Sequence, residues 1–497
     1  MELHNPVLSG FNPDPSIVRV GSTYFLACSS FEYLPGIPVY SSQDLRSWQL
    51  IGNVATRPGQ LHVAGVATGL GAWAPTIRHH DGRFWLVITV VGQGALVFTA
   101  DDAAGPWSDP VLLDGLNGID PDIAWDDEGN CYITFSGLIL SGEGMGRHLG
   151  IQQVRVNPLT GEVLEAPRPL WSGTGLMFPE APHLYRIGEH WYLMIAEGGT
   201  ERGHCVSIAR SDSPMGPFEG CPSNPILSAR STARPIQNTG HGDLVQTPDG
   251  EWLMFCLGMR TRSGTRAFSP MGRESFGTNV RWADGWPVVD PVLLSDPSPA
   301  VTETEDFDCE ALPQSWVGVR RYPGEVSSLS TRPGWLTLTA DGSSMSDLRP
   351  CFVGQRQRHE RVFITTLVDV ADGVGGLALR IDEHQYVQVV AGNGAVRASV
   401  HLHEISQEVA APLDGQHATL FIRTIAPTGE GFMMSGPDTV IVGFLRDGEA
   451  AELLRFDGRY LSAETGESFV GRAFGVVAVE GTVAFDFVRY EGVDGAR

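Results

Sequence analysis

The sequence has few of the features that mark nucleic-acid-binding or membrane-surface proteins. Lys and Arg together number 34 against 58 Asp and Glu, which gives a formal net charge of −24. Nucleic acids and anionic membranes both attract clustered basic residues. This balance therefore argues against both as partners and leaves a neutral ligand as the compatible choice.

Long apolar runs and paired cysteines are also missing. No apolar stretch reaches the roughly 18 residues that a membrane helix requires, and the first residues lack the basic and apolar regions of a secretory signal. The seven cysteines are scattered without a Cys-x-x-Cys pair, which favours reduced, buried thiols over disulfides or a zinc site. We therefore expect a cytoplasmic protein.

The helical periodicity of an α/β fold is absent, whereas turn residues are abundant, with 60 Gly and 33 Pro. A glycine followed by an aromatic, apolar segment recurs five times, which predicts five β-hairpins. These glycines are Gly21, Gly82, Gly129, Gly188 and Gly250. Repeats of roughly 50 to 60 residues are typical of a β-propeller, so we predict five blades over residues 1–295.

A short polar or proline-marked segment precedes each hairpin glycine. In the first repeat it is Gly10–Ser16, where two prolines flank Asp14 and hold it on a stiff backbone. Later repeats offer Trp73, Asp120, Glu180 and His241 in comparable segments. Because the first strand of every blade lines the central channel, we expect these residues to converge, with Asp14, Asp120 and Glu180 in equivalent positions.

Converging carboxyl groups suit the hydrolysis of a glycosidic bond. That reaction needs one acid to protonate the leaving oxygen and a second carboxylate that acts as base or nucleophile. Clustered carboxylates repel one another, so one holds its proton near neutral pH while another stays ionised. A third carboxylate can tune the pair.

Several ordered motifs resemble glycoside hydrolase family 43, and most closely its two-domain β-xylosidases and α-L-arabinofuranosidases. The motifs are Asn5-Pro6-Val7-Leu8, Gly-Phe-Asn-Pro-Asp-Pro-Ser at 10–16, Ser-Ser-Phe-Glu-Tyr-Leu-Pro-Gly at 29–36, Trp73-Ala74-Pro75, Ile119-Asp120-Pro121, Glu-Ala-Pro-His-Leu-Tyr at 180–185 and Ala-Glu-Gly-Gly-Thr at 196–200. The resemblance covers about residues 5 to 295, and the remainder more loosely.

The resemblance implies catalytic roles for three carboxylates. Asp14 would be the general base that activates water, Glu180 the general acid, and Asp120 the residue that orients the acid and adjusts its pKa. The family inverts configuration, which implies an acid-to-base separation of about 6.5–9.5 Å. Asp122 follows Asp120 by two residues and points to the same strand face, so it is a second candidate for the tuning role.

The resemblance also implies substrate-binding residues. Arg273 matches an arginine that contacts sugar hydroxyls and the catalytic carboxylates, and His241 lies near the channel axis. Trp73 and Phe31 are candidate sugar-stacking aromatics, although such residues are as readily part of a core. No cofactor is expected. Near His241, the residues favour calcium with mostly water ligands, or no metal at all, over zinc.

A second domain follows the repeats. Residues 296–305 are rich in proline and polar residues and predict a linker. Alternating apolar segments across 306–497 predict a β-sandwich. The resemblance implies that a loop of this domain closes the pocket, which favours short substrates and exo attack.

The leading hypothesis is an exo-acting, inverting glycosidase that releases a terminal pentose, β-D-xylose from xylooligosaccharides. An α-L-arabinofuranosidase is the alternative on the same fold, and a non-catalytic carbohydrate-binding propeller is the alternative from another class. A fructan-processing propeller is disfavoured because its Arg-Asp-Pro and Glu-Cys signatures are missing. The expected partner is a small oligosaccharide, and the sequence leaves a homo-oligomer open.

Overall fold

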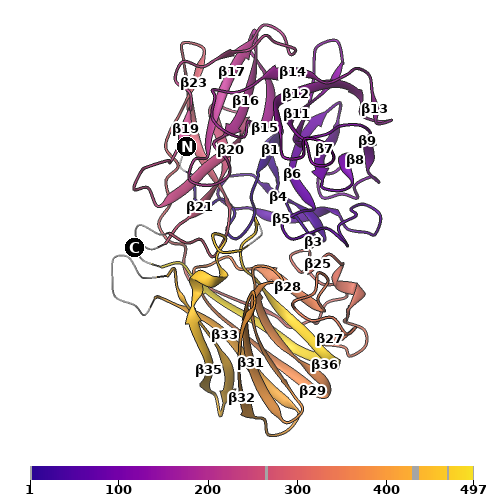
Figure 1. Ribbon diagram of the computed structural model, residues 1–497, viewed down its shortest axis with the longest axis vertical. Helices are drawn as coiled ribbons and strands as arrows, with labels where there is room; N and C mark the ends of the chain where they lie inside the picture. Colours follow the sequence, from indigo (N-terminus) through magenta and orange to yellow (C-terminus); the bar gives the residue numbers. More distant parts are fainter. Residues whose placement is uncertain (1–2, 263–266, 428–435, 467–468, 496–497) are drawn as a thin grey trace.

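The chain folds into a β-propeller stacked on a β-sandwich, as seen in a computed structural model that describes residues 3–262, 267–427, 436–466 and 469–495. The propeller, coloured indigo to magenta, lies above the orange and yellow sandwich (Figure 1). The predicted all-β fold class, with five blades and a C-terminal sandwich, is confirmed. Among the described residues, no helix is long and apolar enough to span a membrane.

Five antiparallel sheets form the blades. Blade one contains β1 (Ser16–Val20), β2 (Thr23–Ala27), β4 (Gly36–Ser42) and β5 (Gln49–Ala55). Blade two contains β6 (Ala72–His80), β7 (Arg83–Val90), β8 (Gly94–Ala100) and β9 (Val111–Leu113). Blade three contains β10 (Ile119–Trp125), β11 (Cys131–Leu138), β12 (His148–Asn157), β13 (Glu162–Val163) and β14 (Arg168–Trp171). Blade four contains β15 (Glu180–Ile187), β16 (His190–Glu197), β17 (Cys205–Ser211), β18 (Glu219–Gly220) and β19 (Leu227–Ser228). Blade five contains β20 (Ile236–Gln246), β21 (Trp252–Arg260), β22 (Glu274–Ala283) and β23 (Trp286–Val289).

The hairpin glycines turn the chain between the first two strands of each blade. Gly21 and Gly129, for example, have φ angles of 60° and 81°, which a side chain on Cβ disfavours. The aromatic residues that follow pack between blades: Phe84 is 5 % exposed and Tyr132 only 2 %. The glycine therefore sets the turn, and the aromatic residue after it anchors the second strand in the core.

The inner strand of every blade carries the same irregularity at its start. In β10 the pairing passes from Ile119↔Ser136 to Asp122↔Thr134, so the inner strand holds one extra residue, a β-bulge. Bulges with the same count occur in β6, β15 and β20. Blade one repeats it just before β1, where the Ser29 N–H donates to the Pro13 carbonyl before Ser16 pairs with Ala27.

β20 carries two such bulges, and the one that begins at Gly240 matches those of the other blades. At this matching bulge of each blade the second residue has left-handed backbone, with φ between 48° and 57°. These residues are Asp14, Ala74, Asp120, Ala181 and His241. The predicted equivalence of Asp14, Asp120 and Glu180 is therefore wrong for Glu180, which precedes Ala181 and shares the position of Trp73. Because a bulge sets two residues opposite one, both of its positions supply residues to the channel mouth.

Below the bulge residues, a second layer, made of charged side chains, fills the channel. Arg78 of β6 reaches across it and pairs with Asp122 (Nη2–Oδ1 2.8 Å) and Asp243 (Nη1–Oδ2 2.8 Å). Its Nη2 also lies 2.9 Å from His183 Nδ1, and the Tyr185 hydroxyl donates to Asp243. Asp122 is fully buried there, so its carboxylate belongs to this ionic layer rather than to the mouth.

The sandwich is built from two long strands, β29 (Arg361–Arg380) and β36 (Ala473–Val493), that pair with each other and run through both of its sheets. One sheet continues through β30 (Gln385–Gly392), β31 (Ala395–Leu402) and β32 (Ile405–Pro412) on one side, and β28 (Phe352–Arg356) and β25 (Val317–Val319) on the other. The other contains β24 (Val301–Glu305), β33 (His417–Ile425), β34 (Thr439–Arg446) and β35 (Glu449–Asp457). The strands β26 (Ser327–Ser328) and β27 (Leu336–Thr339) and the short helices η1 (Pro323–Glu325) and η2 (Gly458–Leu461) complete the domain.

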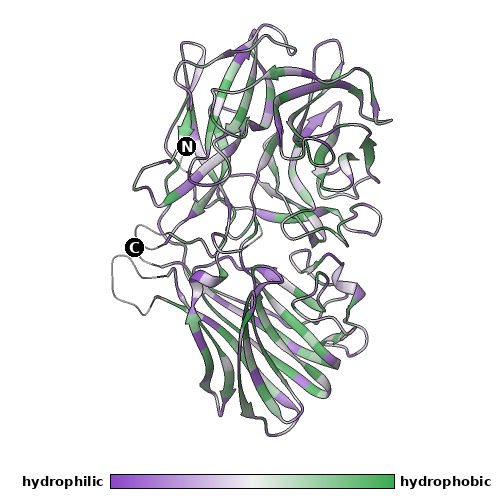
Figure 2. Cartoon of the chain, in the orientation of Figure 1, coloured by the Kyte–Doolittle hydropathy of each residue, from purple (hydrophilic) through white to green (hydrophobic). Residues whose placement is uncertain are grey.

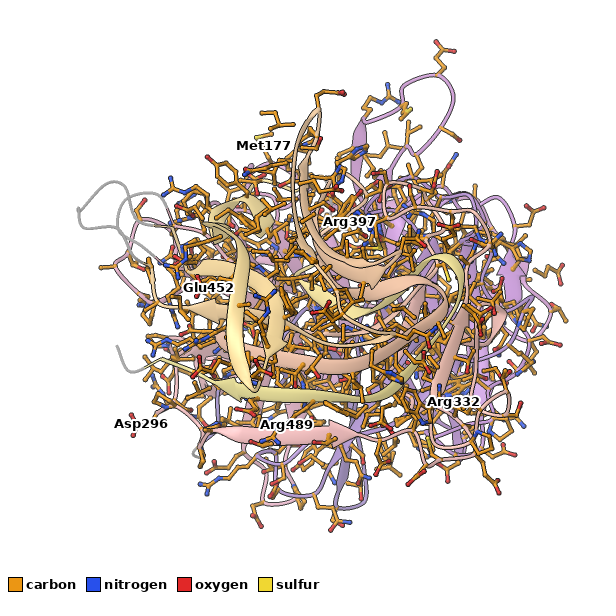
Figure 3. All side chains as sticks on the ribbon, turned by 90° about the horizontal axis from the view of Figure 1, so that it is seen from below. Met177, Asp296, Arg332, Arg397, Glu452 and Arg489 are labelled. Carbon is orange, nitrogen blue, oxygen red and sulfur yellow. The ribbon has the colours of Figure 1, made fainter. Side chains whose placement is uncertain are left out.

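Apolar and polar residues mix along the sandwich strands (Figure 2), because inward-facing side chains form the core while their neighbours face solvent. Seen from below, the sandwich strands lie in front of the propeller (Figure 3). Arg397, Glu452 and Arg489 mark three of them, β31, β35 and β36.

The two domains share a sheet. A two-residue strand from the propeller, β3 (Tyr33–Leu34), pairs with β25 at the edge of the sandwich. Residues 301–305, inside the predicted linker, form β24 and pair with β36. The sandwich is thus attached next to Phe31, on the wall of the channel mouth.

Candidate active site

A cavity of about 590 Å³ opens at the channel mouth, within the usual range for small-molecule sites. All seven residues predicted for the site line it: Asp14, Phe31, Trp73, Asp120, Glu180, His241 and Arg273. Arg78 and its partners Asp122 and Asp243 fill the channel below the bulge residues, so they form the floor of the cavity.

Asp14 is 4 % exposed and accepts hydrogen bonds from two neighbours. Its Oδ1 accepts from Arg273 Nη1 at 3.1 Å, and its Oδ2 accepts from the Ser29 hydroxyl at 2.5 Å. Burial alone would raise the pKa of Asp14, but the Arg273 guanidinium and the Ser29 hydroxyl outweigh it and hold that pKa below its usual value. Asp14 is therefore ionised near neutral pH.

Glu180 and Asp120 behave in the opposite way. Burial raises the pKa of Glu180 well above its usual value, and the negative charge of Asp120 raises it further. Burial, followed by the charge of Asp14, raises the pKa of Asp120 to about 7, although the Ala181 N–H donates to its Oδ2 at 3.0 Å. The cluster therefore keeps a proton on Glu180 while Asp14 is ionised.

Two of the three histidines that line the cavity, His241 and His204, are deeply buried and neutral. Burial lowers the pKa of His241 to about 3 and that of His204 to about 4. His241 Nδ1 lies 3.5 Å from Asp14 Oδ1, which is a contact between a neutral ring and a carboxylate near pH 7. The His204 Nδ1–H donates to the Asn238 carbonyl at 3.0 Å, which leaves Nε2 as an acceptor.

Aromatic rings form one wall of the cavity. Trp73 is fixed by its indole N–H, which donates to the Gly69 carbonyl at 2.8 Å. Phe469, from the sandwich, lies edge-on to Trp73 with ring centroids 5.9 Å apart and contacts Phe31 at 6.3 Å. The Arg273 guanidinium lies over the Phe469 ring at 5.2 Å. A loop of the second domain thus completes the pocket.

Sequence reasoning missed several lining residues. Phe469 lies almost 200 positions beyond Arg273, in a domain without a repeat register, and nothing in its neighbourhood indicates the contact. Thr200 belongs to the Ala-Glu-Gly-Gly-Thr motif at 196–200, for which the sequence predicts no role. Its hydroxyl accepts a hydrogen bond from Arg273 Nη1 at 3.0 Å. His148, the first residue of β12 in blade three, and His204, just before β17 in blade four, also line the cavity, but neither stands in the segment before a hairpin glycine from which the site residues were predicted.

No group of three or more His, Cys, Asp or Glu side chains within the described ranges is arranged to hold a metal. Around His241 the nearest ring is that of His183, 6.2 Å away, and Nδ1 faces Asp14. These residues therefore do not form a site that would bind a metal ion directly.

The channel mouth of the five-bladed propeller gathers one ionised carboxylate and two carboxyl groups with raised pKa values, walled by aromatic rings, which is the arrangement that glycoside hydrolysis requires. Residues 3–287 match the family model of glycosyl hydrolases family 43, and residues 304–491 match that of the β-xylosidase C-terminal concanavalin A-like domain. The chain belongs to glycoside hydrolase family 43. It is therefore an enzyme that acts on oligosaccharides, in a family that generally needs no cofactor.

The relatives carry two kinds of name. The chain is 40% identical over 412 residues to the non-reducing end α-L-arabinofuranosidase BoGH43B of Bacteroides ovatus. The matched region covers 78% of this chain and 75% of that protein. The chain is 38% identical over 380 residues to a xylosidase/arabinosidase of Butyrivibrio fibrisolvens, covering 71% and 72%. The crystal structure of a xylan β-1,4-xylosidase from Bacillus halodurans superposes with a TM-score of 0.88 at 28% identity, covering 99% and 100% of the two chains.

Proposed function

We propose that the protein removes a terminal pentose from the non-reducing end of short oligosaccharides with inversion of configuration, and that β-D-xylose is the preferred sugar. The observation that carries this proposal is the pocket itself, because its carboxyl groups stand at the mouth of a channel that the Arg78 layer fills. The filled channel gives the pocket a floor, and Phe469 of the second domain closes one side of it, an arrangement that suits the end of a sugar chain. The xylosidase names among the relatives support the choice of sugar.

In the proposed reaction Glu180 protonates the glycosidic oxygen as the bond to the leaving sugar breaks. Ionised Asp14 removes a proton from a water molecule, which attacks the anomeric carbon from the opposite face. Asp120 holds the Ala181 N–H and, by its charge, keeps the proton on Glu180 until transfer. Arg273 keeps Asp14 ionised and presents a donor to the sugar beside Thr200.

An α-L-arabinofuranosidase is the second candidate, favoured by the name of the Bacteroides relative. Assays with 4-nitrophenyl β-D-xyloside and 4-nitrophenyl α-L-arabinofuranoside, run side by side at equal enzyme concentration, distinguish the two. A higher kcat/KM for the xyloside supports the first proposal, and a higher value for the arabinofuranoside supports the second. Inactivity toward both would refute a pentosidase.

The Asp14→Ala and Glu180→Ala variants test whether these side chains carry the reaction. Loss of turnover in both variants, with unchanged thermal unfolding, is expected. Normal turnover in either variant would refute the assignment of that residue to the reaction. We also propose a reducing compartment such as the cytoplasm, since all seven cysteines are unpaired and six of them are buried.

A further inference from the structure

The loop between blades one and two, residues 56–71, connects an aromatic wall of the pocket to the second domain. Trp73 lines the pocket, and its indole N–H donates to the carbonyl of Gly69 in this loop at 2.8 Å. The backbone beside the ring is fixed separately, because Ala72 and Phe31 exchange two hydrogen bonds of 3.0 Å. The orientation of the indole therefore depends on where the loop holds the Gly69 carbonyl.

The sandwich holds this loop at two points. Thr68, the residue before Gly69, donates its hydroxyl to Oε1 of Glu383, which lies in the turn between β29 and β30. Arg320, just after β25, donates from Nε to the Val66 carbonyl at 2.8 Å. Both anchoring side chains are buried, since Arg320 is 1 % and Glu383 4 % exposed. The second domain thus sets the position of a propeller loop.

Glu383 is a fixed, charged anchor for Thr68. Its Oε1 lies 3.4 Å from Arg320 Nη2, and its Oε2 lies 3.6 Å from Arg380 Nη2. Burial alone would raise the pKa of Glu383, but the Thr68 hydroxyl and the two guanidinium groups outweigh it and hold that pKa below its usual value. A hydrogen bond to an ionised acceptor is stronger than one between neutral groups, so Thr68 is held firmly.

We propose that Glu383 is a positioning residue, which sets the orientation of the Trp73 indole through Thr68 and Gly69 and thereby the fit of the sugar. A ring packs against the C–H face of a sugar only when its own face is turned toward that sugar. The second domain therefore acts on sugar binding in two ways: Phe469 enters the pocket, and Glu383 orients a propeller residue from behind the pocket wall. The effect on sugar binding rests on the proposed function.

Fluorine NMR on the full chain labelled with 5-fluorotryptophan follows the ring without any substrate. The Trp73→Phe variant identifies the Trp73 signal among those of the 12 tryptophans. Thr68→Val removes the hydroxyl while nearly keeping the shape of the side chain, and it should shift the Trp73 signal. Thr68→Ser restores the hydroxyl and should return the signal to its wild-type position. An unmoved signal in folded Thr68→Val enzyme would overturn the proposal, whatever the enzyme hydrolyses.

Kinetics with the nitrophenyl pentoside that the enzyme hydrolyses faster test the consequence for sugar binding. Thr68→Val should raise KM about three- to ten-fold, with a smaller change in kcat. Thr68→Ser should restore KM. The matched control, Thr339→Val, removes the hydroxyl of an exposed threonine on β27 and should leave KM unchanged.

A double-mutant cycle separates positioning from a general loss of stability. Trp73→Phe already lacks the N–H that binds Gly69, so adding Thr68→Val to it should change KM by less than about two-fold. Fully additive effects on KM would refute the path through Trp73, as would an unchanged KM in Thr68→Val alone. Inactivity of the wild type toward both pentosides would instead refute the proposed function, and the fluorine signal would still decide whether Glu383 orients the ring.

Discussion

Replacing Arg273 by Gln should shift the pH dependence of the reaction. The guanidinium lies 3.1 Å from Asp14, and both side chains are at least nine-tenths buried. A hydrogen bond between such charged groups contributes about 1.5–3 kcal/mol. One pH unit corresponds to 1.36 kcal/mol, so the acidic limb of the kcat/KM profile, set by ionisation of Asp14, should rise by roughly one to two units.

The sign follows from the charges. Arg273 lowers the pKa of Asp14, so its removal makes that carboxylate harder to ionise and the enzyme loses activity at a higher pH than before. Arg273 also opposes the raised pKa of Asp120 and of Glu180, but its effect is smaller than those of burial and of Asp14 on Asp120, and smaller than those of burial and of Asp120 on Glu180. The alkaline limb should therefore rise less, and the bell-shaped profile should narrow.

The assay is the initial rate of nitrophenyl pentoside hydrolysis between pH 4 and pH 9, with unfolding followed at each pH. Arg273→Lys keeps the charge and should keep the acidic limb near its wild-type position, although it lowers the rate. Arg281→Gln, an exposed position on β22, is the matched control and should change nothing. An acidic limb that stayed in place or moved downward in Arg273→Gln would refute the assignment of Asp14 as the ionised base.

Four further predictions concern three side chains. Glu180→Gln should lower kcat with nitrophenyl substrates less than with xylobiose, whose leaving group needs protonation; equal losses would argue against Glu180 as the acid. The same variant should unfold at a higher temperature at pH 7, because a carboxyl group with a raised folded-state pKa costs stability once the pH exceeds its unfolded-state pKa. Ala181→Gly should stabilise the fold by about 0.5–1 kcal/mol in urea unfolding, since Ala181 has a φ of 51°. Phe469→Ala should raise KM roughly five- to ten-fold with a smaller change in kcat, and an unchanged KM would show that the sandwich does not close the pocket.

The blades could be predicted from the sequence because their signal is local. A glycine with left-handed backbone and an aromatic residue that anchors the next strand recur in every repeat, and Gly21 and Gly129 illustrate the rule. The bulges could not be predicted, because the extra residue is Asp in one blade and Ala in another and has no common side chain. The misplaced equivalence of Glu180 is a direct result.

The site residues in the propeller could be predicted from the sequence. The residue that enters the site from the second domain could not, because its position depends on how the two domains pack. Asp14, Asp120 and Glu180 stand in motifs beside proline, whereas Phe469 reaches the pocket because β3 joins the sandwich sheet next to Phe31. Such a contact joins segments that no repeat relates. The ionic role of Asp122 likewise depends on Arg78 of another blade, so strand alternation alone left Asp122 as a second candidate beside Asp120.

If Glu180 and Asp14 act from opposite faces of the sugar as acid and base, hydrolysis inverts the anomeric carbon. Proton NMR of the first-formed product measures this directly, with the wild-type enzyme and whichever pentoside it hydrolyses faster. The inverted anomer should appear first, α-D-xylose from a β-D-xyloside, and the other anomer should follow only by mutarotation. Initial release of the retained anomer would show that Asp14 does not act as a base on water.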